Sequence, residues 1–406
     1  MRIQIVVSIL FCCSTTFAGD EALLIKGQRV DGGTITGGRG TWNISGGAVP
    51  ADEVLMIRFS PEPPPSRMNS GVFIRGGSML AGSLAGIVGD NADVSSSALG
   101  PLKLKRDDIA GAFSPLPSGQ QENMPELARY CRILAATLGS DGSSLKPGKR
   151  VRVRFAGLDE VEGERVMRLG GEQILLSTKN KAVETINRQF VRLIELKVPD
   201  APAAADASAG PEFIVRLKSG DLLRGRVIKL DDKSLTLQTT FMGEKSLERG
   251  MLAALFLAGG EGTKLNWLSA MSPAKAVHTP VFDAEFPHRM DCSVDGNDMI
   301  LAGQPCERGI GVHSRSELQF TLPGTPARFI TVCGIDAETR GRGSVIAKVL
   351  ADGKELWKSK TVTGKDAPEI VSLDLGSAKT LTLQVDYADD DDSGDHFDWG
   401  WAAISK

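Results

Sequence analysis

The 406-residue sequence has few of the residues that carry catalysis or nucleic-acid binding. It contains only four histidines, and 50 acidic residues outnumber 47 basic ones for a net charge of -3. That balance provides no general basic field for nucleic acid or an anionic membrane, so we expect no nucleic-acid partner. No activated serine motif and no metal-ligand triad stand out. A hydrolase would have little chemistry to use, and we expect a protein that is not an enzyme, with no catalytic residues.

Long apolar runs are missing beyond the N-terminus. Residues 3–13 form a short apolar run after Arg2, and Thr16-Phe17-Ala18 follows it. This pattern predicts a signal peptide over residues 1–18, and the run is too short to predict a transmembrane segment. Lipid anchoring through Cys12 or Cys13 is the less favoured alternative, because bulky Phe11 precedes them. We therefore expect an exported protein, whether periplasmic, cell-surface or secreted.

Cysteines are also few, and their spacing includes no C-x-x-C of the kind typical of zinc sites. Cleavage after Ala18 would leave Cys131, Cys292, Cys306 and Cys333. Export permits disulfides. Cys292 and Cys306 flank a short hairpin-like segment, so they are the predicted disulfide pair.

Glycine is abundant, with 46 residues, and it punctuates a repeat of roughly 40 residues in the first two thirds of the chain. Each copy has an apolar strand, a glycine turn, further alternating strands and a final segment carrying arginine or an acidic residue before an apolar run. The copies resemble small Sm-like or SH3-like β-barrels and span residues 22–60, 70–116, 148–197 and 212–259. A helical connector is predicted at residues 122–139, with Cys131 on its buried stripe, and a linker at residues 198–211.

The character of the chain changes at residue 264. Strands with alternating apolar residues follow one another at roughly 10-residue spacing, separated by turns such as Asp352-Gly353. Such a series predicts an antiparallel sandwich or jelly roll. The fold class expected for the whole chain is therefore all-β and multidomain, with tandem barrel repeats before a β-sandwich.

Residues 264–406 also resemble a known family, the NPCBM family of carbohydrate-binding modules found attached to some glycoside hydrolases. The resemblance is carried by "GIGVHSRSEL", "GIDAE", "GSVIAKVLADGKELWKS", "TGKDAP" and "LTLQVDYADDDDSGDHFDW". It implies a galactose-binding-like β-sandwich whose loops bind a glycan. We expect an exported, non-catalytic, glycan-binding protein. The alternative is a structural or assembly protein of the cell envelope, whose modules bind envelope proteins.

The residues expected to bind carbohydrate are His313, Asp336, Trp357, His396 and Asp398. His313 would donate to a sugar hydroxyl or serve as a fixed scaffold histidine, and a neighbouring aspartate would hold His396 in one tautomer. Trp357 would offer a stacking face. Trp399 and Trp401 alternate across Gly400, so both indoles should lie on one face of the last strand and pack in the core.

The acidic run at residues 389–392 is the candidate metal site. Asp389, Asp391 and Asp395 could supply oxygen ligands to a structural calcium ion. The spacing lacks the EF-hand pattern, and a solvated charge run is the alternative.

Overall fold

The computed structural model describes twelve stretches of the chain: residues 19–31, 33–60, 70–114, 151–155, 160–180, 182–196, 210–259, 264–280, 285–324, 326, 328–388 and 391–406. Their secondary structure consists of β-strands and short 3-10 turns, which confirms the all-β expectation. The predicted signal peptide and the predicted helix at residues 122–139 lie outside the described residues. Within the described part of the chain, no helix is long and apolar enough to cross a membrane.

Four groups of strands lie close to the ranges predicted for the repeats, whose bounds stay a prediction, and in each group a 3-10 turn precedes the last strand. The first group holds β1 (Glu21–Leu24), β2 (Arg29–Asp31), β3 (Thr36–Gly38), β4 (Thr41–Ile44), β5 (Gly47–Pro50) and β6 (Val54–Arg58). The second holds β7 (Gly71–Ile74), β8 (Ser78–Val88), β9 (Asn91–Ser96), β10 (Gly100–Lys105) and β11 (Ile109–Phe113). We call these groups repeats 1 and 2.

Repeats 3 and 4 follow the same plan. Repeat 3 holds β12 (Val151–Phe155), β13 (Glu160–Gly163), β14 (Arg165–Gly170), β15 (Gln173–Ser177), β16 (Val183–Asn187) and β17 (Val191–Glu195). Repeat 4 holds β18 (Phe213–Leu217), β19 (Leu222–Leu230), β20 (Ser234–Thr239), β21 (Gly243–Glu248) and β22 (Leu252–Leu257). The first strand of repeat 4 pairs with both its second and its last strand. The Sm-like assignment itself stays a prediction.

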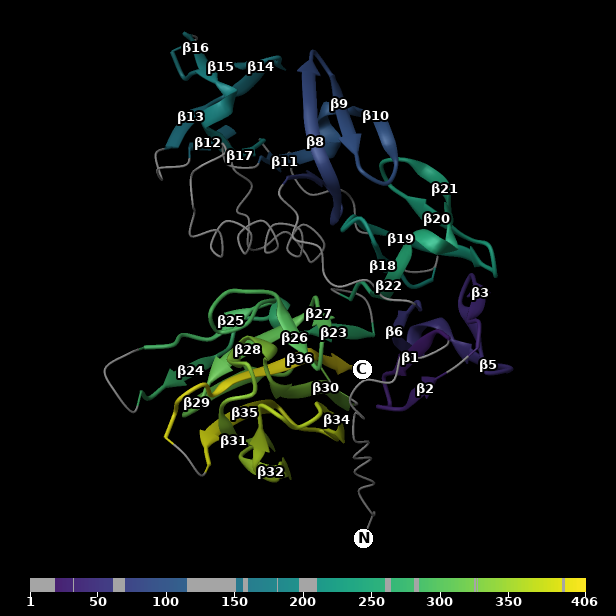
Figure 1. Ribbon diagram of the computed structural model, residues 1–406, viewed down its shortest axis with the longest axis vertical. Helices are drawn as coiled ribbons and strands as arrows, with labels where there is room; N and C mark the ends of the chain where they lie inside the picture. Colours follow the sequence, from purple (N-terminus) through teal and green to yellow (C-terminus); the bar gives the residue numbers. More distant parts are fainter. Residues whose placement is uncertain are drawn as a thin grey trace.

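The repeats associate in pairs through their last strands. β22 of repeat 4 pairs antiparallel with β6 of repeat 1, and β11 of repeat 2 pairs with β17 of repeat 3. Repeats 2 and 4 meet where β19 pairs with β8, beside the buried carboxylate of Asp221. Figure 1 shows repeats 2 and 3 at the far end of the molecule from the C-terminal domain, with repeats 1 and 4 beside it.

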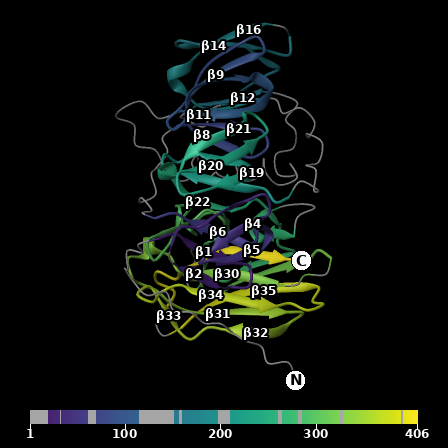
Figure 2. The ribbon, with the colours of Figure 1, turned by 90° about the vertical axis from the view of Figure 1, so that its right-hand side faces the viewer.

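The C-terminal domain is a sandwich of two antiparallel sheets (Figure 2). One sheet runs β25 (Arg289–Met290), β28 (Gly309–His313), β36 (His396–Ser405), β30 (Arg328–Ile335) and β34 (Glu369–Asp374), with β23 (Leu265–Trp267) on β36. The other runs β24 (Lys275–His278), β29 (Ser316–Thr321), β35 (Thr380–Tyr387), β31 (Ser344–Ala351) and β32 (Lys354–Lys358), with β33 (Val362–Thr363) on β31. A small hairpin joins β26 (Met299–Leu301) to β27 (Gln304–Cys306).

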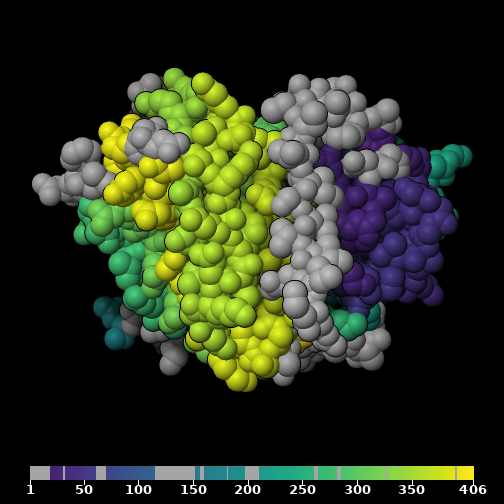
Figure 3. Space-filling view, turned by 90° about the horizontal axis from the view of Figure 1, so that it is seen from below, coloured from purple at the N-terminus to yellow at the C-terminus, as the bar shows by residue number. Residues whose placement is uncertain are grey.

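The sandwich packs against repeat 4 through an aromatic cluster. Trp401 of β36 lies 5.1 Å from Phe256 of β22 and 5.8 Å from Trp267, measured between ring centroids. The Trp267 indole donates to the Leu257 carbonyl, and a side chain at Gly259 would come within 2.7 Å of that indole. Seen from below, the sandwich and repeat 1 occupy neighbouring halves of the surface (Figure 3). Burial of this much aromatic surface makes the sandwich and the repeats one packed body.

Polar contacts reinforce the same interface. Ser372 of β34 donates to the Ile25 carbonyl of repeat 1. Arg216 of repeat 4 forms an ion pair with Glu307, and both side chains are largely buried. A partly desolvated ion pair is screened less than one at the surface. The contacts therefore fix the orientation of the sandwich on the repeats.

Two predictions made from the sequence are wrong in this fold. Trp357 is only 7% exposed, because its side chain turns into the sandwich core opposite Val349 and lies 6.3 Å from Trp399. It cannot act as a stacking face for sugar. The Cys292–Cys306 disulfide is not formed: Cys306 is a free thiol packed toward Gly400, whereas the Cys292 thiol donates to the Met290 carbonyl.

Candidate functional site

Three of the chain's four histidines gather at one end of the sandwich. β28 and β36 pair so that His313 lies directly opposite His396, with ring centroids 5.6 Å apart. Opposed residues of an antiparallel pair share one face of the sheet. His278, at the end of β24 in the other sheet, lies 5.7 Å from His313. The fold therefore joins histidines from two sheets and three distant segments.

Phe286 provides the apolar surface of this cluster. Its ring stacks on His313 at 4.2 Å with an interplanar angle of 11°, and its backbone N–H donates to His278 Nδ1. Phe286 is half-buried, whereas His313 is 3% exposed. His313 therefore lies beneath Phe286 as part of the floor.

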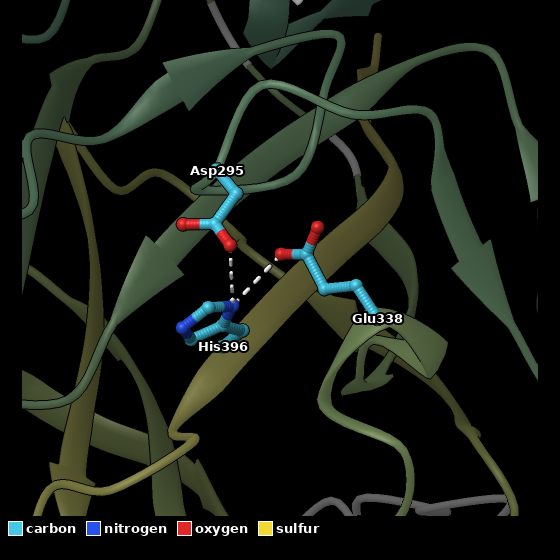
Figure 4. A group of neighbouring side chains, drawn as sticks. All are labelled: Asp295, Glu338 and His396. Atoms are coloured by element: carbon cyan, nitrogen blue, oxygen red, sulfur yellow. Dashed lines mark hydrogen bonds and ion pairs between the residues drawn. The ribbon is translucent and has the colours of Figure 1, made fainter.

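Carboxylates surround His396 on its open side (Figure 4). The 3-10 turn Ala337–Thr339 follows β30 and presents Glu338, whose Oε1 lies 2.8 Å from His396 Nδ1. The other Glu338 oxygen accepts hydrogen bonds from Ser293 Oγ and Asn297 Nδ2, each at 2.8 Å. Asp295 Oδ2 lies 3.7 Å from the same His396 nitrogen. Glu338, rather than Asp395 or Asp398, orients His396, so that expectation is corrected.

The two paired histidines have pKa values shifted in opposite directions. Burial and the neighbouring His396 lower the pKa of His313 to about 4, so His313 is neutral near pH 7. Burial alone would lower the pKa of His396, but the hydrogen bond to Glu338 and the charge of Asp295 raise it above its usual value. Burial opposes ionisation of Glu338, yet its bonds to His396, Asn297 and Ser293 hold its pKa below the usual value. The hydrogen bond between Glu338 and His396 therefore shifts both pKa values toward the charged forms.

Asp336 and Asp398 lie beneath this surface, at 2% and 0% exposure. Asp336 accepts from the Glu338 and Ile300 backbone N–H groups, so it caps the turn that presents Glu338. Burial and the charge of Asp336 raise the pKa of Asp398 well above its usual value. These carboxyl groups lie beneath the turn that presents Glu338, and their burial corrects the expectation that they contact sugar directly.

Asp391 and Asp395, two of the three candidate calcium ligands, do not join this site. Asp395 is buried and accepts from the Ser344 N–H, whereas Asp391 is exposed and accepts from the Ser393 N–H. Asp389 lies outside the described residues, and calcium binding there stays a prediction. Among the residues that the structure describes, the group able to hold a metal ion is Asp295, Glu338 and His396, whose ligand atoms all lie within 4.8 Å of one another.

Sequence reasoning found some of these residues and missed others. His313, Asp336, His396 and Asp398 were expected and do come together. Asp295, Asn297, Phe286 and His278 were missed, because they lie 99 to 118 positions before His396 and only the packing of β24, β25 and β28 brings them near it. Glu338 belongs to the segment "GIDAE", which carried the family resemblance.

The C-terminal domain is thus an antiparallel β-sandwich with a polar surface at one end. Residues 264–405 are an NPCBM/NEW2 domain. This assignment confirms the resemblance noted in the sequence for the last third of the chain.

Two curated relatives match part of the chain. The alpha-1,3-galactosidase B of Akkermansia muciniphila is 29% identical over 158 residues, which cover 36% of this chain and 19% of that protein. A protein of Renibacterium salmoninarum is 28% identical over 105 residues, covering 26% of this chain and 7% of its own length. The chain thus spans less than a fifth of either curated relative.

Solved structures give similar matches. The CBM51 module from Clostridium perfringens GH95, solved in complex with methyl-galactose, is 27% identical and covers 35% of this chain and 99% of its own, with a TM-score of 0.32. The CBM51-2 and INT domains of Clostridium perfringens ZmpB, solved in complex with GlcNAc, are 23% identical. They cover 44% of this chain and 38% of their own, with a TM-score of 0.33.

Proposed function

We propose that this protein is an exported, non-catalytic glycan-binding protein whose C-terminal domain holds the sugar at the surface formed by Phe286, Asn297, Glu338 and His396. The observation that carries the proposal is the fixed His396–Glu338 pair beside a half-buried aromatic ring, in a domain of the NPCBM/NEW2 family. The Clostridium module matched over 99% of its length was solved with methyl-galactose bound, which supports sugar as the ligand class.

The chemistry of the surface suits a sugar. A hexose presents hydroxyl groups that donate and accept at its rim and C–H groups on its faces. The Glu338 carboxylate accepts from hydroxyls, the His396 ring and the Asn297 amide donate, and Phe286 covers apolar C–H groups. Because these polar side chains already bond one another, they are held in place before the ligand arrives, which reduces the entropy lost on binding.

The charge of the surface restricts which sugars fit. Asp295 and Glu338 lie side by side at the rim. The negative charge of Asp392, in the neighbouring loop, also interacts with the His278 and His313 rings. A sialic acid or sulfate group placed there would meet like charges. We therefore infer preference for neutral sugars.

The test is glycan-array and calorimetric binding on the full chain, since the sandwich shares its aromatic interface with repeat 4. Glu338→Gln and His396→Ala should each weaken binding about tenfold or more, because each removes a charge-assisted hydrogen bond. Asn91→Ala, at an exposed position of repeat 2, is the control and should bind as the wild type. Absence of binding to every neutral glycan, or unchanged affinity in both site variants, would overturn the proposal.

A further inference from the structure

Three side chains present their ligand atoms to one point at the rim of the sandwich. His396 Nδ1, Glu338 Oε1 and Asp295 Oδ2 all lie within 4.8 Å of one another, and Figure 4 shows the three converging from separate elements. Ligand atoms around a tetrahedral ion at about 2.0–2.1 Å lie roughly 3.4 Å apart. The observed separations of 2.8 Å and 3.7 Å from Nδ1 bracket that value.

The charges of the group favour a cation. Two carboxylates face one imidazole, so the group carries a net charge of about -1 with the ring protonated and -2 with it neutral. Asp336 adds a further carboxyl group below Glu338, at 2% exposure. A divalent ion would balance the two carboxylates and leave the imidazole neutral, which is the form that binds metal.

Hydrogen bonds to one oxygen of Glu338 leave its other oxygen, Oε1, directed toward the proposed ligand position. Ser293 and Asn297 both donate to Glu338 Oε2, which directs Oε1 toward His396. The same two residues close a turn, because Asn297 N donates to Ser293 Oγ and Ser293 N donates to the Asn297 carbonyl. Asp295 projects from the middle of that turn. Such outer bonds orient metal ligands in proteins of known metal content.

An independent observation at the same place points to a ligand. His313 is 3% exposed, and its Nδ1 has no hydrogen-bond partner in the described part of the chain. It stands directly across the sheet from His396. A buried ring nitrogen without a partner costs about 1–3 kcal/mol unless something else satisfies it. An ion at His396 would lie on the same face of the sheet as that ring.

The ligand types select the kind of ion. Calcium prefers six to eight oxygen ligands, and this group offers an imidazole nitrogen and two carboxylates. Mixed nitrogen and oxygen ligands with an open fourth position suit Zn²⁺ and similar transition-metal ions.

We propose that Asp295, Glu338 and His396 bind one divalent transition-metal ion of the Zn²⁺ class at the rim of the C-terminal sandwich. Asp391 and Asp395, the described candidate calcium ligands, are not members of this site. It does not depend on the proposed glycan binding, since the ion is measured directly and without sugar.

The experiment is calorimetric titration of ZnCl₂ into full-length protein first treated with chelator and dialysed. The wild type should bind one ion per chain at neutral pH. Asp295→Asn, Glu338→Gln and His396→Gln should each weaken binding at least tenfold. Asp295 has a half-exposed side chain, so its variant should fold normally and provides the decisive comparison.

Asp391→Asn, on the exposed acidic loop, is the matched control and should leave zinc binding unchanged. CaCl₂ in excess should not displace the zinc. Unchanged zinc binding in both Asp295→Asn and His396→Gln would overturn the proposal, as would loss of binding in Asp391→Asn alone. A failure of sugar binding with intact zinc binding would count against the proposed function only.

Discussion

Trp399 and Trp401 lie two residues apart on β36 yet point to opposite faces of the same sheet. Trp399 packs in the sandwich core against Phe397 and Trp357, whereas Trp401 packs against Phe256 of repeat 4. The register between β30 and β36 shifts at Ile330/Val332, and Trp401 adopts a positive φ of 52°. Such a bulge reverses the alternation of side chains along a strand. One strand therefore serves both the core of the sandwich and its interface with the repeats.

Replacing each of these tryptophans should have a distinct effect. Trp399→Ala should destabilise the sandwich by about 3–5 kcal/mol, because it leaves a cavity in the core. Trp401→Ala should instead loosen the contact with repeats 1 and 4, so that thermal unfolding separates into two transitions. Differential scanning calorimetry distinguishes the two outcomes. A single, equally lowered transition in both variants would contradict the division of β36 between two cores.

The sequence predicted that both indoles would be buried, and it was right, since each is 1% exposed. It was wrong that they share a face, because period-two alternation assumes an unbroken ladder. The bulge arises from pairing with β30, some 70 positions away, and from the close approach of Gly400 to the Cys306 thiol and the Val332 carbonyl. Local patterns specify strands, and long-range pairing decides which face each residue occupies.

The candidate site also combines residues that the sequence indicates with residues that only the fold brings together. His313 and His396 lie in motifs that can be found in the sequence, but their cross-strand pairing joins two distant segments and appears only in the fold. Phe286 and Asn297 lie in irregular segments that carry no periodic signal, so only the folded chain brings them to His396. Trp357 was misassigned because a tryptophan between two lysines reads as an exposed residue, although strand alternation turns it inward.

The arginines that begin two of the 3-10 turns hold the paired repeats together. Arg249 of repeat 4 forms an ion pair with Asp20 and donates to the Ile35 carbonyl of repeat 1. Arg188 of repeat 3 donates to the Leu84 and Ala85 carbonyls of repeat 2. Arg249→Ala should cost about 1.5–3 kcal/mol in urea unfolding, and Arg249→Lys should recover little because one ammonium cannot span these acceptors.

Arg168→Ala provides the control, since Arg168 is an exposed arginine on β14. Its midpoint in urea should match that of the wild type. Equal stability of Arg249→Ala and Arg168→Ala would show that the paired arrangement of repeats 1 and 4 does not depend on this side chain.

Cys306 should behave as an inert, reduced thiol. It is 4% exposed, and burial raises the pKa of its thiol well above the usual value, so little reactive thiolate forms near pH 7. Iodoacetamide should fail to modify Cys306 in the native protein and should modify it fully in denaturant without prior reduction. Peptide mass spectrometry measures both. A Cys292–Cys306 disulfide-linked peptide from the unreduced protein would contradict the structure.

The buried carboxylate of Asp221 should make the contact between repeats 2 and 4 sensitive to pH. It accepts hydrogen bonds from the Ala81 N–H and Ser96 Oγ of repeat 2, each at 3.0 Å, and is 0% exposed. Asp221→Ala should cost about 1–3 kcal/mol, because it leaves the buried Ala81 N–H without its acceptor. Asp232→Ala is the control. Asp232 is exposed in the turn between β19 and β20, so its replacement should change the stability little.

The pH dependence follows from the direction of the Asp221 pKa. Burial raises this pKa above its unfolded value, despite the hydrogen bonds from Ser219 and Ser96 that oppose the shift. The stabilisation linked to the protonated carboxyl is complete below the unfolded pKa and is lost as pH rises through the folded pKa. Asp221→Asn keeps an oxygen acceptor and cannot ionise, so its stability relative to the wild type should improve between about pH 4 and pH 7. Urea unfolding of both proteins at the two pH values measures this difference. A difference that stays constant, or that moves in favour of the wild type as pH rises, would show that Asp221 titrates normally in the folded chain.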